Sequence, residues 1–197
     1  MEQRNAILEL MNKNWIYEAI VTTRDLSGGV PRASAMGVST PDFEHISLEV
    51  YRTSKTSENI VRDGKFIINF VMYVELFWKS VTKEHLEFDD AGRLRDADAW
   101  IFAQVETTED AGDKIKINAK ILDNKIKNPN FILINRAKQL TLESIIKFTK
   151  FDFQDGNAAD EINENLRVIK KVAPGSKYEK IVAEILNKIE KPIQANP

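Results

Sequence analysis

Residues 51–71 read YRTSKTSENIVRDGKFIINFV, and they form the most informative segment of the chain. The first nine residues contain four serine and threonine hydroxyls, two cations (Arg52 and Lys55) and Asn59. The hydroxyls lie where a short helix is expected to begin, and Gly64 is a suitable residue to end it. A helix start has free backbone N–H groups and the positive end of a dipole, so it is a ready site for a phosphate. A helix cap explains one hydroxyl, but it does not explain four hydroxyls with two cations.

The segments around this stretch alternate in the manner of short antiparallel strands. Strands are predicted at Trp15–Thr23, Val30–Thr40, His45–Tyr51, Phe66–Val71, Ala99–Thr107 and Lys114–Leu122. The turn Leu26–Gly29 joins the first two strands into a hairpin, and Glu109–Asp113 joins the last two. Phe66–Val71 is apolar apart from Asn69, which predicts a strand that is covered on both faces.

The remaining segments are expected to be helical. Residues 3–12 are predicted to form a short helix, and Tyr73–Thr82, which is ambiguous, could form another. Beyond Asn128–Asn130 the pattern becomes helical, and three helices are predicted with Asn135, Asn157 and Ser176 as their N-caps. Many short strands followed by helices favour an antiparallel barrel or sandwich with a helical tail.

The composition excludes several classes of function. The chain has 197 residues, a net charge of −2 and no cysteine, so disulfides, thiol nucleophiles and cysteine-ligated metals are absent. His45 and His85 are the only histidines and lie 40 residues apart in the sequence, so they are not expected to form a metal pair, and both are expected at the surface or an interface. Nothing favours nucleic acid or a membrane as a partner, and a cytoplasmic location is expected. No dinucleotide, P-loop, zincin or hydrolase motif occurs.

The predicted strand 30–39, VPRASAMGVS, is rich in small side chains. Small side chains allow a flat ligand to approach the backbone and to hydrogen-bond with it. A flat head group beside a phosphate-binding helix start matches the shape of FMN. A strand that is crowded by a bulky neighbour would show the same small residues, and Arg32 is expected to lie in solvent.

Three segments together carry a resemblance to a known family. The order VTTRDLSGGVPRASAMGVS (21–39), SLEVYRTSKTSENI (47–60) and DGKFIINF (63–70) resembles the flavin reductase-like FMN-binding split barrels. The resemblance is closest to an archaeal family of such proteins with a C-terminal helical extension. It is specific over Trp15–Val71 and weaker in the helical tail. It implies a mainly β, α+β fold: an antiparallel split β-barrel over residues 1–131, with a helical extension over 132–197.

The resemblance also implies a cofactor and a site. FMN would be bound in a homodimer, near the subunit interface, by residues on two segments of each chain. The phosphate would be held by Arg52, Thr53, Ser54, Thr56 and Asn59. The isoalloxazine ring would be lined, through backbone groups, by Ser34, Ala35, Met36, Gly37 and Val38.

The activity that the resemblance implies is hydride exchange between a nicotinamide and the flavin. Such chemistry needs no catalytic side chain, because the flavin accepts and gives the hydride while the protein binds and orients it. Three alternatives stay open. They are a non-catalytic flavin- or partner-binding module, an enzyme like pyridoxine-phosphate oxidase, and a barrel that holds a deazaflavin.

Overall fold

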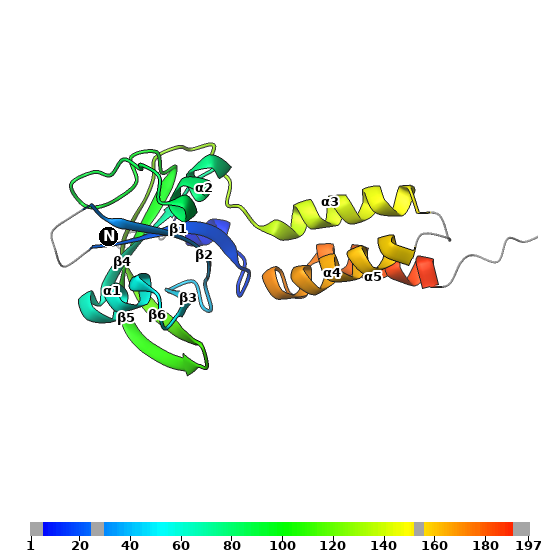
Figure 1. Ribbon diagram of the computed structural model, residues 1–197, viewed down its shortest axis with the longest axis horizontal. Helices are drawn as coiled ribbons and strands as arrows, with labels where there is room; N and C mark the ends of the chain where they lie inside the picture. Colours follow the sequence, from blue (N-terminus) through cyan, green and yellow to red (C-terminus); the bar gives the residue numbers. More distant parts are fainter. Residues whose placement is uncertain (1–5, 25–29, 152–155, 191–197) are drawn as a thin grey trace, which may run out of the picture. The chain divides into compact units, whose positions relative to one another are not determined.

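The computed structural model describes residues 6–24, 30–151 and 156–190. The chain divides into two compact units, Met1–Ile134 and Asn135–Pro197. In Figure 1 the first unit contains the strands and two helices, α1 (Lys55–Asp63) and α2 (Val74–Thr82). The second unit contains three helices, α3 (Arg136–Thr149), α4 (Gly156–Val172) and α5 (Lys177–Glu190). Sequence reasoning placed the division at residue 131.

The first unit is a closed, six-stranded antiparallel β-barrel, which confirms the predicted fold class. Its strands are β1 (Tyr17–Thr23), β2 (Arg32–Ser39), β3 (His45–Tyr51), β4 (Lys65–Phe70), β5 (Ala99–Ala111) and β6 (Lys114–Ile126). Around the barrel they run in the order β1-β2-β3-β6-β5-β4, and β4 closes the barrel against β1. The predicted hairpins β1–β2 and β5–β6 both form.

Alternation along the strands builds the core, because successive side chains point to opposite faces. Ile46, Leu48 and Val50 of β3 are buried and belong to the main cluster inside the barrel. A second cluster lies on the outer face of β1 and β2, where Ile20 and Ala33 are buried with residues such as Leu76 of α2 (Val74–Thr82). Successive residues of β4 from Phe66 to Phe70 are all buried, which confirms that this strand is covered on both faces.

Helix α1 (Lys55–Asp63) forms where the hydroxyl loop predicts it. Ser54 is its N-cap, and the Ser54 hydroxyl accepts a hydrogen bond from the backbone N–H of Ser57 at 3.1 Å. Gly64 ends the helix with φ 63°, a left-handed conformation that side chains with a Cβ rarely adopt. Both predicted ends of this helix are therefore confirmed.

Three local predictions are wrong in detail. The described part of residues 3–12 contains a 3₁₀ turn, Leu8–Leu10, and no longer helix, because one turn already buries Leu8 in the barrel core. The predicted loop Glu109–Asp113 is mostly strand, since Gly112, with φ 75°, makes a tighter turn to β6. Asn157 lies inside α4 (Gly156–Val172) and does not precede it. The predicted turn Leu26–Gly29 lies outside the described residues.

The second unit packs α3 (Arg136–Thr149), α4 and α5 (Lys177–Glu190) against one another. Asn135 caps α3 as predicted, because its side chain accepts from the backbone N–H of Ala137 at 2.9 Å. Ser176 caps α5 by accepting from the backbone N–H of Glu179 at 3.2 Å. Within the described ranges, no helix is both long and apolar enough to cross a bilayer.

His45 joins two parts of the barrel. Its Nδ1 lies 2.7 Å from Asp42 Oδ2, and its Nε2 lies 3.1 Å from Glu106 Oε2. Glu106 falls at a register shift of β5, where a bulge can redirect a side chain. The hydrogen bond with Asp42, above all other causes, raises the pKa of His45. Among the described residues, no group of three or more His, Cys, Asp or Glu side chains could hold a metal ion.

Candidate functional site

The barrel closes, but its ladder between β2 and β3 is short, so most of one edge of β2 is unpaired. On its other edge, β2 pairs with β1 from Arg32 to Val38, and β3 pairs with β6 along its whole length. Between β2 and β3, the described residues pair only at Val38–Leu48 and Ser39–Ser47. Alternate backbone N–H and C=O groups between Arg32 and Gly37 therefore face an edge that has no ladder partner. These groups are available to a ligand.

The start of α1 lies at this open edge. The Ser34 hydroxyl of β2 and the Thr56 hydroxyl of α1 are hydrogen-bonded at 2.7 Å. Among the described residues, the backbone N–H groups of Thr53, Lys55 and Thr56 have no hydrogen-bond partner. The structure thus brings together the two segments that the sequence marks, the small-residue strand and the hydroxyl loop.

The predicted ring-binding residues differ in their surroundings. Ala35 is exposed, Ser34 is half-buried, and Met36 packs partly against the barrel core. Val38 is buried in the core, so its side chain supports the strand and faces no ligand. A Cβ on Gly37 would lie 2.4 Å from Cγ2 of Ile16, so the crowding that sequence reasoning kept as an alternative does occur at this position.

Some of the predicted phosphate-binding residues lie at the helix start, and others are hydrogen-bonded to other parts of the barrel. Thr53 is exposed, while Ser54 and Thr56 lie at the helix start. Arg52 is held by the β5–β6 turn, since its Nε donates to Gly112 O at 2.8 Å and its Nη2 lies 2.5 Å from Asp110 Oδ2. Asn59 is buried and donates to Thr23 Oγ1 at 3.0 Å, which ties α1 to β1.

Sequence reasoning set Arg32 aside as a solvent residue, and the structure corrects this. Its Nε is buried, and it has no hydrogen-bond partner among the described residues. Arg32 and Ser34 are two positions apart on β2, so their side chains lie on the same face of the strand. A buried donor without a partner is costly, and a ligand that accepts a hydrogen bond there would remove that cost. Burial of this Nε depends on tertiary structure, so the sequence contains no signal for it.

Crowding at Gly37 leads to a prediction about stability. Gly37→Ala is expected to lower the free energy of unfolding by about 1–3 kcal/mol, because the new Cβ overlaps the Ile16 side chain. In an Ile16→Ala background the same change should cost much less, since the overlapping methyl group is gone. Urea unfolding of the four proteins of this cycle measures the coupling. Equal costs in both backgrounds would show that Ile16 is not the reason for the glycine.

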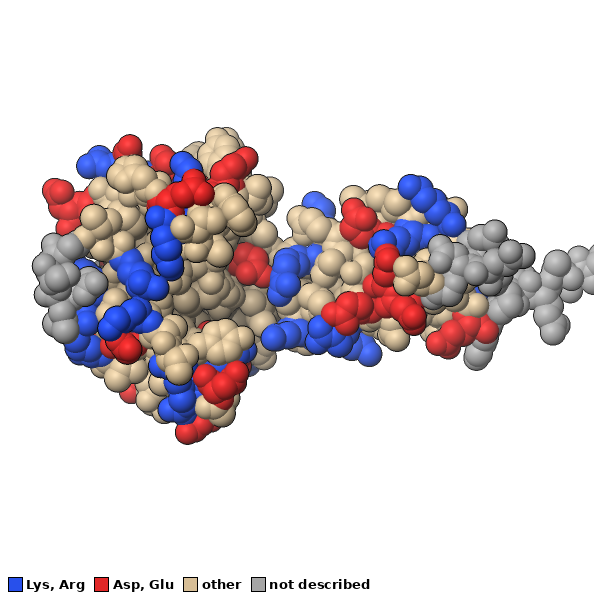
Figure 2. Space-filling model, in the orientation of Figure 1, with Lys and Arg blue, Asp and Glu red and all other residues tan. Residues whose placement is uncertain are grey.

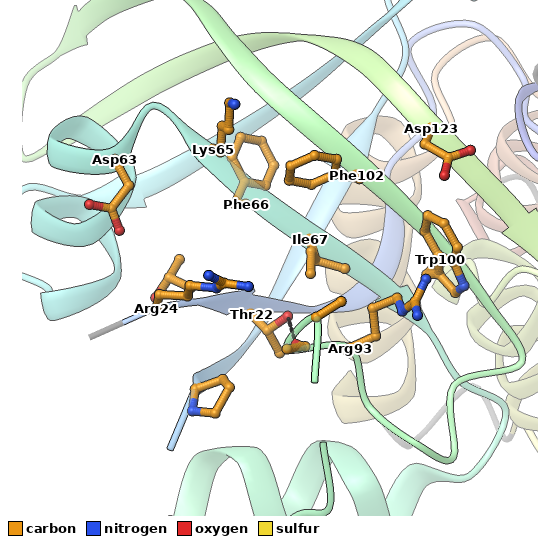
Figure 3. A pocket seen from close by; sticks show the side chains of 14 residues that line it. Thr22, Arg24, Asp63, Lys65, Phe66, Ile67, Arg93, Trp100, Phe102 and Asp123 are labelled. Atoms are coloured by element: carbon orange, nitrogen blue, oxygen red, sulfur yellow. Dashed lines mark hydrogen bonds between the residues drawn. The ribbon is translucent and has the colours of Figure 1, made fainter. Parts of the chain in front are cut away.

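A separate pocket of about 490 Å³ lies over β1, β4 and β5. Ile67 and Trp100 contribute apolar wall, and Arg24, Lys65 and Arg93 contribute cations (Figure 3). Sequence reasoning did not identify this pocket, because its residues come from segments that are distant in the chain.

Comparison with known proteins agrees with this architecture. Residues 17–128 match the family described as "Protein of unknown function (DUF447) N-terminal domain". The FMN-bound protein MM1853 from Methanosarcina mazei, assigned to the same family, has a similar structure with a TM-score of 0.54 and 17% identity. The alignment covers 93% of this chain and 99% of that chain. A flavoredoxin from Methanosarcina acetivorans gives a TM-score of 0.49 and 14% identity, over 62% of this chain and 76% of that one.

Fold and comparison define a class of protein, the split β-barrels with one partly unpaired strand edge. Within that class, the chain belongs to the DUF447 family.

Proposed function

We propose that this chain binds FMN, with the phosphate at the start of α1 and the isoalloxazine ring along the open edge of β2. One observation carries the proposal: the unpaired edge of β2 meets the hydroxyl-rich start of α1 through the Ser34–Thr56 hydrogen bond. The FMN-bound state of MM1853, whose fold is similar, supports the choice of ligand.

The phosphate would be held mainly by groups that the fold leaves without other partners. The backbone N–H groups at the helix start and the exposed Thr53 hydroxyl are donors of this kind. The buried Nε of Arg32, on the same face of β2 as Ser34, is a further donor. Asn59 and Val38 would hold the two segments in place without contacting FMN through their side chains, because Asn59 is hydrogen-bonded to Thr23 and Val38 is packed in the barrel core.

The ring would lie against backbone groups. Ala35 is small and exposed, so the edge of a flat ligand can approach β2 without a side chain between them. Alternating N–H and C=O groups on an unpaired strand match the alternating acceptors and donors at the edge of a flavin. The protein would bind and orient the ring, and no nucleophile or base is required of it.

The reaction that we propose is flavin-dependent hydride exchange with a nicotinamide, in a homodimer. FMN supplies the redox chemistry when it is bound. Turnover of NADH or NADPH by the loaded protein, with sedimentation to measure the dimer, tests this part of the proposal. Tight FMN binding without any turnover would favour a non-catalytic flavin-binding module.

The experiment that tests FMN binding compares FMN with riboflavin, which lacks the phosphate. Titration of the protein should give FMN an affinity at least about tenfold higher, because hydrogen bonds to a charged group are worth about 1.5–3 kcal/mol each. The absorption spectrum of the purified protein, with mass spectrometry of any released ligand, identifies what it carries. Equal affinities would refute the phosphate site, and a deazaflavin mass would replace FMN as the ligand.

A further inference from the structure

The pocket over β1, β4 and β5 is distinct from the proposed flavin site. In the order of strands, β1 separates β4 from β2, and the open edge of β2 faces the opposite neighbour, β3. The two sites lie at opposite ends of helix α1. Thr56, in the first turn of α1, is bonded to Ser34 at the open edge, whereas Asp63, the last residue of α1, lines the pocket.

The walls of the pocket are suited to a flat apolar group. Ile67, Trp100 and Phe102 lie side by side along neighbouring strands, because Ile67 pairs with Phe102 and Asn69 pairs with Trp100. The guanidinium of Arg93 lies 4.6 Å from the centre of the Trp100 ring. Its Nε is bound to Asp89 at 2.7 Å, so this arrangement is held in place from outside the pocket. A volume of about 490 Å³ is sufficient for a small organic molecule.

The pocket also has positive charge that its own acids do not neutralise. Within the described residues, the side chains of Arg24 and Lys65 make no hydrogen bond or ion pair. Asp63 is hydrogen-bonded to Arg62 at 2.6 Å and 2.7 Å, and the charge of Arg24 acts on it only at longer range, where it adds to the lowering of the Asp63 pKa by Arg62. Figure 3 shows the Arg24 guanidinium directed toward the middle of the pocket. Basic side chains gather on the barrel unit over α1 and β4 (Figure 2).

The segment that forms one side of the pocket is fixed by buried hydrogen bonds. Thr22 donates to the carbonyl of Gly92 at 2.9 Å, and Asn69 accepts from the backbone N–H of Leu94 at 3.0 Å. These bonds attach the wall of the pocket to β1 and β4 of the barrel.

We propose that this pocket is a second binding site, for a planar aromatic anion whose ring lies against Ile67, Phe102 and Trp100 and whose charged group meets Arg24. The flat ring matches the apolar wall, and the anion matches the cations that make no hydrogen bond there, whereas a cationic ligand would meet Arg24 and Lys65 unfavourably.

A matched pair of probes tests both parts of the proposal. Calorimetric titration of the full chain with 2-naphthoate, and separately with the uncharged 2-naphthamide, is carried out with and without excess FMN. The naphthoate is expected to bind at one site per chain, more tightly than the amide, and FMN should leave its affinity unchanged. Failure of FMN itself to bind would refute the proposed flavin site and would leave this measurement intact.

Three variants identify the site. Arg24→Gln should weaken naphthoate about tenfold or more and leave the amide nearly unchanged, because only the charged contact is lost. Asp123→Asn removes an anion from the same pocket and should strengthen naphthoate binding slightly. Ala91→Trp, at an exposed rim position, should block both probes. Lys120→Gln, an exposed position outside the pocket, is the control.

Several results would overturn the proposal. The first is that naphthoate does not bind, whether or not a second copy of the chain covers the pocket. The second is that naphthoate still binds both Arg24→Gln and Ala91→Trp. Circular dichroism and the thermal midpoint report whether each variant folds. If Ala91→Trp does not fold, the opposite effects of Arg24→Gln and Asp123→Asn decide the question alone.

Discussion

Asn69→Ala is expected to lower the free energy of unfolding by about 3–5 kcal/mol. Asn69 is fully buried between the barrel and its outer covering. Its Nδ2 donates to the carbonyl of Ile20 at 2.9 Å and to the Thr22 hydroxyl at 3.2 Å, and its Oδ1 accepts from the N–H of Leu94 at 3.0 Å. Alanine would leave the buried N–H of Leu94 without its acceptor, would remove the hydrogen bonds to Ile20 and Thr22, and would also leave a cavity. Urea unfolding measures the change.

The matched control for this prediction is Asn118→Ala. Asn118 is also a strand asparagine, but it lies at the surface and donates to Thr107 and Glu109 at 3.3 Å, where water can replace it. Its replacement should cost no more than about 0.5 kcal/mol. Similar costs at the two positions would show that the network around Asn69 does not hold the outer segment to the barrel.

The combined change Thr53→Ala and Thr56→Val is expected to weaken FMN binding about 100-fold or more. Two hydroxyls at the helix start are lost, and each hydrogen bond to a charged phosphate is worth about 1.5–3 kcal/mol. Riboflavin affinity should change little, because riboflavin has no phosphate for these groups to bind. Fluorescence titration with both flavins measures the two effects on the same protein.

Thr141→Val provides the control for the buried hydroxyl. Thr56 and Thr141 are both 4% exposed and both lie on helices, but the Thr141 hydroxyl donates to the carbonyl of Ala137 in the helical unit. Its replacement should leave both flavin affinities unchanged. Equal losses of FMN and riboflavin in the double variant would mean that Thr56 positions the site and does not contact the phosphate.

Much of the local structure can be predicted from the sequence. Ser54 and Gly64 mark the ends of α1, and Asn135 and Ser176 mark the starts of α3 and α5, because a cap depends on residues that are neighbours in the chain. The clean alternation of His45–Tyr51 predicts a strand with one buried face for the same reason. Asn157 was predicted as a cap but lies within α4, since its place depends on where the preceding segment joins the helix.

Local sequence patterns set the succession of strands and helices along the chain, most of their ends, and the two segments that mark the proposed flavin site. Tertiary structure alone decided how those residues are used. It paired Ser34 with Thr56, engaged Asn59 with Thr23, and buried the Nε of Arg32. It also assembled the pocket from several distant segments. The physical reason is that caps, turns and alternation act between near neighbours, whereas these contacts form only when the barrel closes.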